Sequence, residues 1–133
     1  MTYKVEKDWI TSAGLRAVVI ITELGHRCGY VGVPSKHKLF GVDYDEVDVE
    51  VHGGLTYSSG ISEYPVEDSK LWWLGYDCAH LGDQVVPEYI AAQKEKYPDK
   101  SFMWRDDMGI HRTLAYCERE CESLAEQLMK QNQ

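Results

Sequence analysis

Two cysteine–histidine couples are the residues of this chain best suited to chemistry. One string carries His26 and Cys28, and a second carries Cys78 and His80 in the opposite order. Residues i and i+2 of a β-strand point to the same face of the sheet. If both strings are extended and their strands are neighbours, the four side chains converge. We therefore predict that Cys28 and Cys78 mark one shared site.

Three interpretations fit such a site. Two thiolates and two imidazoles suit Zn²⁺, which makes His26, Cys28, Cys78 and His80 a candidate zinc set, although structural zinc motifs usually space their ligands through a turn. Alternatively, His80 activates Cys78 as a catalytic nucleophile. The third interpretation is structural, with a buried cysteine beside a histidine that faces the surface.

A further histidine, His52, stands directly before Gly53 and Gly54. Glycines let a ligand or a backbone segment pass close to an imidazole ring, and four hydroxyl residues follow at positions 56–59. Exposed backbone N–H groups in such a segment can hold an anion. We expect His52 to join Cys78 and His80 as a candidate catalytic residue, but a glycine bulge in an edge strand explains the string equally well.

The charge distribution suggests an anion site. The chain has a net charge of −8, yet the segment from His26 to Lys38 contains three Lys or Arg residues and no acid. Positions 43–50 then reverse the sign with five acids. The basic segment is therefore either a ligand-binding patch or the partner of the acidic stretch across a hairpin.

The aromatic residues are unusual in type. Four Trp and nine Tyr stand against two Phe, and rings with a polar handle are enriched in binding sites. They could equally line the core of a small sheet. If they form a site, rings supply stacking surface and the basic segment supplies charge for phosphate. The candidate ligand-binding residues are His26, Arg27, Tyr30, Lys36, His52, Gly53, Gly54, Tyr57 and Trp73.

Charge and hydropathy argue against two classes of partner. An excess of acids disfavours general nucleic-acid binding, which depends on Lys and Arg. The first residues lack the apolar segment of a signal peptide, and the longest aliphatic run, at positions 17–21, is too short to span a bilayer. We expect a cytoplasmic protein with reduced cysteines and no membrane partner, and a homo-oligomer stays open.

Short apolar segments must position these residues. The pattern predicts strands at Leu15–Thr22, His26–Val33 and Leu71–Cys78, with the first two joined as a β-hairpin. Alternating valines predict a further strand from Val47 to Tyr57. A helix is predicted from Pro87 to Tyr97, because proline favours the first helical turn.

The C-terminal helix has the clearest pattern. Leu114, Cys117, Cys121, Leu124 and Leu128 recur three and four residues apart and form one apolar stripe. Both cysteines on the stripe are then core residues. The chain is thus predicted to be a single α+β domain over residues 1–133. Its antiparallel sheet of about four strands would be packed by this helix and by the second, shorter one.

Several strings resemble a family of small uncharacterised proteins encoded mainly by bacteriophages and prophages. They are GHRCGYVGVP, DVEVHGGLTYS and WWLGYDCAHLGD, together with the helix string CERECESLAEQL. The resemblance runs from about Gly25 to Leu128 and is weakest between Val85 and Met108. It implies a phage origin and implies that the Cys, His and Gly strings belong together, but it supplies no reaction, cofactor or catalytic residue.

Three hypotheses of function follow. The leading one is a phage accessory protein, acting in counter-defence inside the bacterial host, that binds a small anionic ligand such as a nucleotide signal, or binds a host defence protein. The second is a small hydrolase that uses a cysteine–histidine or metal site on a nucleotide or an amide. The third is a zinc-stabilised interaction module, zinc being the one cofactor that the residues suggest.

Overall fold

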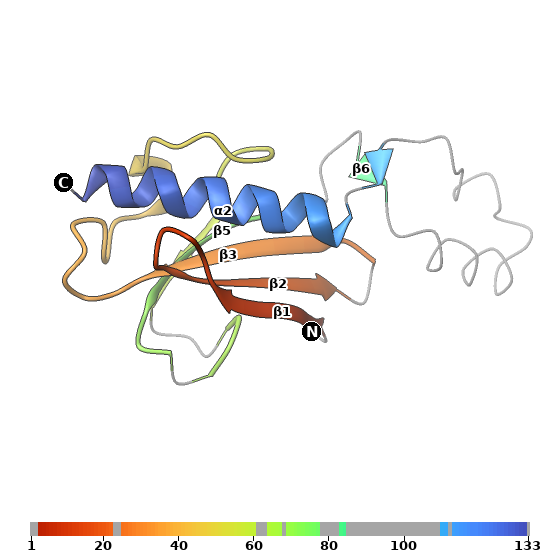
Figure 1. The fold of residues 1–133 in the computed structure, drawn as a ribbon, viewed down its shortest axis with the longest axis horizontal. Helices are drawn as coiled ribbons and strands as arrows, with labels where there is room; N and C mark the ends of the chain where they lie inside the picture. Colours follow the sequence, from red (N-terminus) through yellow and green to blue (C-terminus); the bar gives the residue numbers. More distant parts are fainter. Residues whose placement is uncertain are drawn as a thin grey trace, which may run out of the picture.

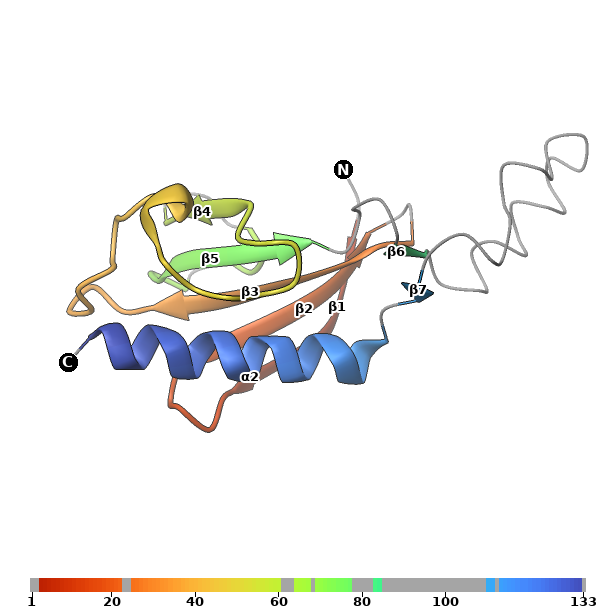
Figure 2. The ribbon, with the colours of Figure 1, turned by 90° about the horizontal axis from the view of Figure 1, so that it is seen from above.

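The computed structural model describes residues 3–22, 25–60, 64–67, 69–77, 83–84, 110–111 and 113–132. These residues form a five-stranded antiparallel sheet with one long helix, α2, lying along one of its faces (Figures 1 and 2). The strand order is β1-β2-β3-β5-β4, and the bounds are β1 (Tyr3–Ile10), β2 (Arg16–Thr22), β3 (Arg27–Val33), β4 (Tyr57–Ser59), β5 (Trp72–Asp77) and α2 (Leu114–Gln131).

Three smaller elements complete the described chain. A 3-10 turn, η1, spans Tyr44–Glu46, and two short strands, β6 (Asp83–Gln84) and β7 (Ile110–His111), pair in parallel. The predicted α+β class is confirmed, with five strands in the main sheet instead of about four. The second predicted helix, from Pro87 to Tyr97, lies outside the described residues.

The predicted hairpin is confirmed, and its first strand is buried on both sides of the sheet. Ala17 and Val19 belong to the core beneath α2, whereas Val18 and Ile20 belong to a second core on the opposite face. A strand covered on both faces needs apolar residues at successive positions. This requirement accounts for the unbroken aliphatic run in the sequence.

Two glycine–tyrosine pairs set the contact between β3 and β5. In their antiparallel register Gly29 lies opposite Tyr76, and Tyr30 lies opposite Gly75. A Cβ atom on Gly29 would come within 2.5 Å of the Tyr76 ring, and one on Gly75 within 2.3 Å of the Tyr30 ring. Each ring therefore lies over the glycine of the neighbouring strand, and the two rings lie on opposite faces of the sheet.

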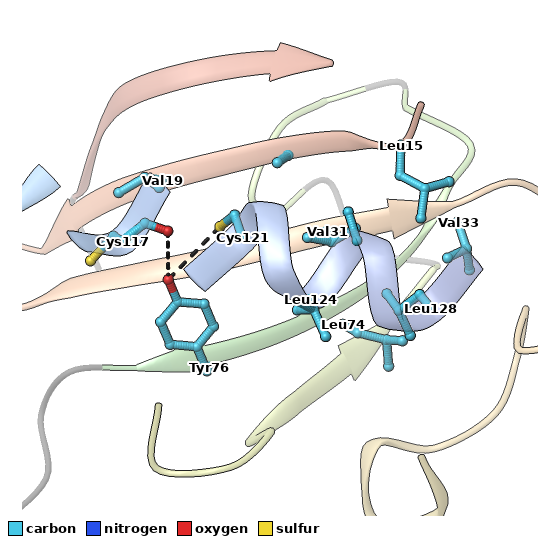
Figure 3. Close-up of a cluster of buried hydrophobic side chains, with 12 residues drawn as sticks. Leu15, Val19, Val31, Val33, Leu74, Tyr76, Cys117, Cys121, Leu124 and Leu128 are labelled. Atoms are coloured by element: carbon cyan, nitrogen blue, oxygen red, sulfur yellow. Dashed lines mark hydrogen bonds between the residues drawn. The ribbon is translucent and has the colours of Figure 1, made fainter. Parts of the chain in front are cut away.

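The α2 helix closes the face that carries Tyr76. Its predicted stripe is confirmed, since Cys117, Cys121, Leu124 and Leu128 are fully buried. The Tyr76 hydroxyl donates a hydrogen bond to the Cys117 carbonyl oxygen at 2.9 Å and lies 3.8 Å from the Cys121 sulfur (Figure 3). One tyrosine of β5 thus fixes the position of α2 along the sheet.

The strand predicted from Val47 to Tyr57 is wrong over most of its length. The side-chain amide of Gln127 both accepts from the Glu50 N–H and donates to the Glu50 carbonyl, each at 2.8 Å. The Gln131 amide donates to the Asp48 carbonyl at 2.7 Å. Side chains of α2 therefore satisfy backbone groups that a neighbouring strand would otherwise pair. The valines still pack against the core, as their alternation predicted, but the strand begins only at Tyr57.

The first strand was not predicted, because charged residues interrupt its pattern. It pairs with β2 and contains an irregularity between Val5 and Lys7. Two side chains of β1 also contact α2. The Trp9 indole N–H donates to Glu122 at 2.8 Å, and the Lys7 ammonium lies 2.9 Å from the Glu118 carboxylate. Backbone pairing with β2 and side-chain contacts with α2, rather than local alternation, stabilise this edge strand.

The first prediction tests the glycine–tyrosine packing. Gly75→Ala should lower the free energy of unfolding by about 1–3 kcal/mol, because the new methyl group displaces the Tyr30 ring. The same substitution in a Tyr30→Ala background should cost much less, since the clashing ring is gone. Urea unfolding of the four proteins of this double-mutant cycle measures the coupling. An equal cost in both backgrounds would contradict the packing described here.

Candidate functional site

An open cavity of about 580 Å³ lies on the sheet face opposite α2, a size common for small-molecule sites. It is bordered by three adjacent strands, β3, β5 and β4. Four tyrosines are among its lining residues: Tyr30 on β3, Tyr57 on β4, Tyr64 in the connection that leads to β5, and Tyr76 on β5. Because the Tyr76 side chain belongs to the core beneath α2, the other three form the aromatic wall on this face. Sheet pairing explains part of the arrangement, because Tyr30 and Tyr57 both lie opposite Gly75 on the intervening strand.

We call Tyr3, Tyr30, Tyr57 and Tyr64 the tyrosine cluster. Their rings stand at large angles to one another. Tyr30 stands at 86° to Tyr57 and at 87° to Tyr64, and Tyr57 stands at 69° to Tyr64, with centroids 5.2–5.6 Å apart. Tyr3 adds an edge contact to Tyr64 at 4.9 Å. The three wall rings therefore pack edge to face on one another.

Hydrogen bonds hold the tyrosine cluster together. The Tyr3 hydroxyl donates to the Pro65 carbonyl at 2.8 Å, and the hydroxyls of Tyr30 and Tyr64 bond to each other. Burial raises the pKa of Tyr64 to about 12 and raises that of Tyr30 well above its ordinary value. The phenols of Tyr30 and Tyr64 are therefore uncharged at neutral pH.

The polar part of the wall contains Thr56, Ser59, Cys28 and Asp77. Thr56 donates to the Asp77 carboxylate at 3.3 Å, and Asp77 lies directly opposite Cys28 in the pairing of β3 and β5. Asp77 is the one charged side chain among the lining residues that the structure describes. The described wall of the cavity thus has aromatic, hydroxyl and acidic character, and no basic side chain.

Cys28 is a neutral thiol in this structure. Its side chain is 8% exposed. Burial raises its pKa to about 11, and the nearby Asp77 carboxylate acts in the same direction, while a hydrogen bond with Tyr30 acts in the opposite one. A nucleophile or a zinc ligand requires the thiolate. This environment disfavours both roles for Cys28 as it stands.

The predicted shared site is described only in part. The strand of Cys28 does lie beside β5, which ends at Asp77. Cys78 and His80 themselves lie outside the described residues, so the zinc set and the catalytic pair stay predictions. Across the part of the chain that is described, no three His, Cys, Asp or Glu side chains gather as a metal site would need.

His26 and His52 do not share the environment of Cys28. His26 precedes β3 and belongs to the turn after β2, where its N–H donates to the Thr22 hydroxyl at 3.3 Å. His52 lies on the α2 side: its Nδ1 is 2.9 Å from the Tyr116 hydroxyl, and its N–H donates to Glu120 at 2.7 Å. Its neighbours Gly53 and Gly54 adopt positive φ and shape the turn that follows.

The basic segment contributes mainly structural contacts. Arg27 forms an ion pair with Glu6 at 2.7 Å, and Lys36 is exposed. His37 is buried, accepts from the Leu39 N–H at Nδ1 and bonds through Nε2 to the Leu128 carbonyl in the last turn of α2, each at 3.0 Å. Helix ends leave such carbonyls without a partner in the helix.

The candidate ligand-binding residues therefore separate into two groups. Tyr30 and Tyr57 line the cavity, and Trp73 packs in the core beneath it. The remaining candidates lie in turns or on the α2 side, and none of them lines the cavity: His26, Arg27, Lys36, His52, Gly53 and Gly54. Sequence reasoning missed Tyr3 and Tyr64, which reach the cluster through tertiary contacts alone; the high tyrosine count was the only signal for them.

The second prediction concerns the reactivity of Cys28. A rise in pKa from 9.0 to about 11 lowers the thiolate fraction at pH 8 roughly 100-fold. Native protein treated with iodoacetamide should therefore leave Cys28 largely unmodified, while urea-unfolded protein is alkylated. Peptide mass spectrometry separates Cys28 from the other cysteines. Alkylation of the native form at the unfolded rate would contradict a buried neutral thiol.

The third prediction concerns alkaline pH. Acidic groups with a raised pKa in the folded state stabilise it below their unfolded pKa and lose that contribution as the pH rises. Cys28, Cys121, Tyr30 and Tyr64 all have raised values. The melting temperature should therefore fall between about pH 9 and pH 12, and Tyr64→Phe should reduce the slope above about pH 10. A melting temperature that does not change over this range would contradict the assignment.

Comparisons with known proteins give no relative for this site. No protein-family model, no curated protein and no solved structure matches the chain. Among the described residues, no helix is both long enough and apolar enough to cross a membrane.

Proposed function

We propose that this protein binds a small organic molecule in the tyrosine-lined cavity. The observation that carries the proposal is the convergence of Tyr30, Tyr57 and Tyr64 around an open space of about 580 Å³. Large rigid rings give contact area at a low entropic cost, and their hydroxyls orient a ligand. A wall of this kind favours a ligand with a flat or compact apolar part.

The cavity itself gives less support to an anionic ligand. The basic residues expected to hold a phosphate do not line the cavity: Arg27 pairs with Glu6, and Lys36 is exposed in the segment after β3. The carboxylate of Asp77 stands at the cavity instead. The lining residues that the structure describes therefore offer no positive charge to an anion.

The broader role that we propose is a binding role in a bacterial host. It rests on the resemblance of four strings to phage-encoded proteins, and the protein would sequester a ligand of the host. Alternatively, the partner is a host defence protein that this protein binds and inhibits. For the hydrolase alternative, the neutral thiol of Cys28 offers no support, and its other residues, Cys78 and His80, lie outside the described residues.

The fourth prediction tests ligand binding. A panel of small aromatic and heterocyclic compounds, with neutral, cationic and anionic members including nucleotides, should contain at least one that raises the melting temperature in a saturable way. Tyr57→Ala should weaken the binding of that compound at least about tenfold, because the substitution removes one ring of the cavity wall.

Tyr44→Ala provides the matched control for this experiment. Tyr44 is 40% exposed in η1 and does not line the cavity, so its removal should leave binding unchanged. If both substitutions weakened binding equally, the compound would not bind in the cavity. The absence of any stabilising compound would count against the proposed function.

A further inference from the structure

A second groove lies on the α2 side of the molecule, between α2 and the segment Asp48–His52 (yellow in Figure 1). Its volume is about 520 Å³. The segment contributes Glu50, Val51 and His52 to its lining, and α2 contributes Glu120, Ser123 and Gln127. None of these residues lines the tyrosine-lined cavity. The groove is therefore separate from the site of the proposed function.

Hydrogen bonds explain why the groove opens at this place. Four residues of a helix rise about 6 Å, close to the length of two extended residues. The amides of Gln131 and Gln127 therefore reach backbone groups two residues apart in the segment. The next bond, from the His52 N–H to Glu120, lies seven residues and about 10 Å closer to the N-terminus of α2. Ser123, between these positions, bonds to Gln127 instead, and the wider gap forms the groove.

Two carboxylates border the groove. Glu120 accepts the His52 N–H through Oε1, whereas Glu50 is held by its backbone alone, through Gln127. Neither carboxylate pairs with a Lys or Arg of the described residues. The imidazole of His52 also borders the groove, and its Nδ1 lies 2.9 Å from the Tyr116 hydroxyl. The groove thus offers two carboxylates to a cationic group.

Exposed acids continue along the same segment. Asp45, Glu46 and Asp48 are exposed, and no Lys or Arg of the described chain pairs with them. Val47 and Val49 pack against the core, so the alternation turns the acids between them outward. Neutral amides of α2, in place of Lys or Arg, hold the backbone of the segment. A ligand with several positive charges therefore suits this face better than a single small cation.

We propose that the groove binds an arginine side chain from a basic segment of a partner protein, with its guanidinium between Glu50 and Glu120. A guanidinium is planar, has five N–H donors that match carboxylates in pairs, and is less strongly hydrated than an ammonium group. The Ser123 hydroxyl borders the same groove and is a further acceptor. Other Lys or Arg residues of the partner meet Glu46 and Asp48. This inference does not depend on a ligand in the cavity.

A pair of peptides tests this inference. The probe is a fluorescently labelled peptide with one arginine between two lysines, spaced by glycines, and its twin has lysine in place of the arginine. Both peptides have the same charge, so they differ only in the group that enters the groove. Anisotropy titration of the full chain at low salt should give about threefold tighter binding for the arginine peptide.

Matched variants locate the site. Glu50→Gln and Glu120→Gln should each weaken binding of the arginine peptide about fivefold, and the glutamine amide oxygen can still accept the His52 N–H. Glu67→Gln is the control, because Glu67 is exposed and does not line the groove, while its substitution changes the net charge equally. The affinity of this control should stay within about twofold of the wild type. Melting curves of each variant verify that the fold is kept.

Three outcomes overturn the arginine site. They are no binding of the arginine peptide, equal affinity for the two peptides, and an equal loss from Glu67→Gln and from the groove variants. Tyr57→Ala separates this inference from the proposed function. It should weaken a ligand of the cavity and leave the peptide unaffected, so the failure of either site is recognised without the other.

Discussion

The rest of the structure depends on the reciprocal packing of two tyrosines over two glycines at the centre of the sheet. Gly29 and Gly75 have no side chain, so the rings of Tyr76 and Tyr30 can lie over the neighbouring strand. A single Cβ atom at either position would displace a ring. Glycine weakens a strand when it stands alone, and a cross-strand aromatic ring restores the lost packing.

The two rings have different consequences because they lie on opposite faces. Tyr76 reaches the backbone of α2 at Cys117 and so locates the helix. Tyr30 reaches Tyr64 in a loop and so builds one wall of the cavity. The core beneath α2 and the candidate site therefore both depend on the same pair of glycine–tyrosine contacts. A change at either glycine is expected to affect stability and ligand binding together.

Several residues that resemble functional ones in the sequence instead form hydrogen bonds with α2. His37 bonds to a carbonyl in its last turn, and His52 bonds to Tyr116 and Glu120. Gln127 binds the backbone of Glu50 as a strand would. Histidines and an extended polar segment are then explained by helix packing, which leaves the tyrosine-lined face as the part of the described chain best suited to a ligand.

Local patterns determined the elements with a strong apolar signal: the β2–β3 hairpin, β5 and the buried stripe of α2 with Cys117 and Cys121. These follow from side-chain periodicity, which the sequence contains in full. Only the tertiary structure decided that β1 is a strand, through its pairing with β2, and that most of the segment after Val47 is not, because side chains of α2 more than 70 residues away bond to its backbone. The candidate site was decided in the same way. Tyr30 and Tyr57 were identifiable by type, but their meeting with Tyr64 and Asp77 results from strand pairing across Gly75, and no local pattern encodes which strands become neighbours.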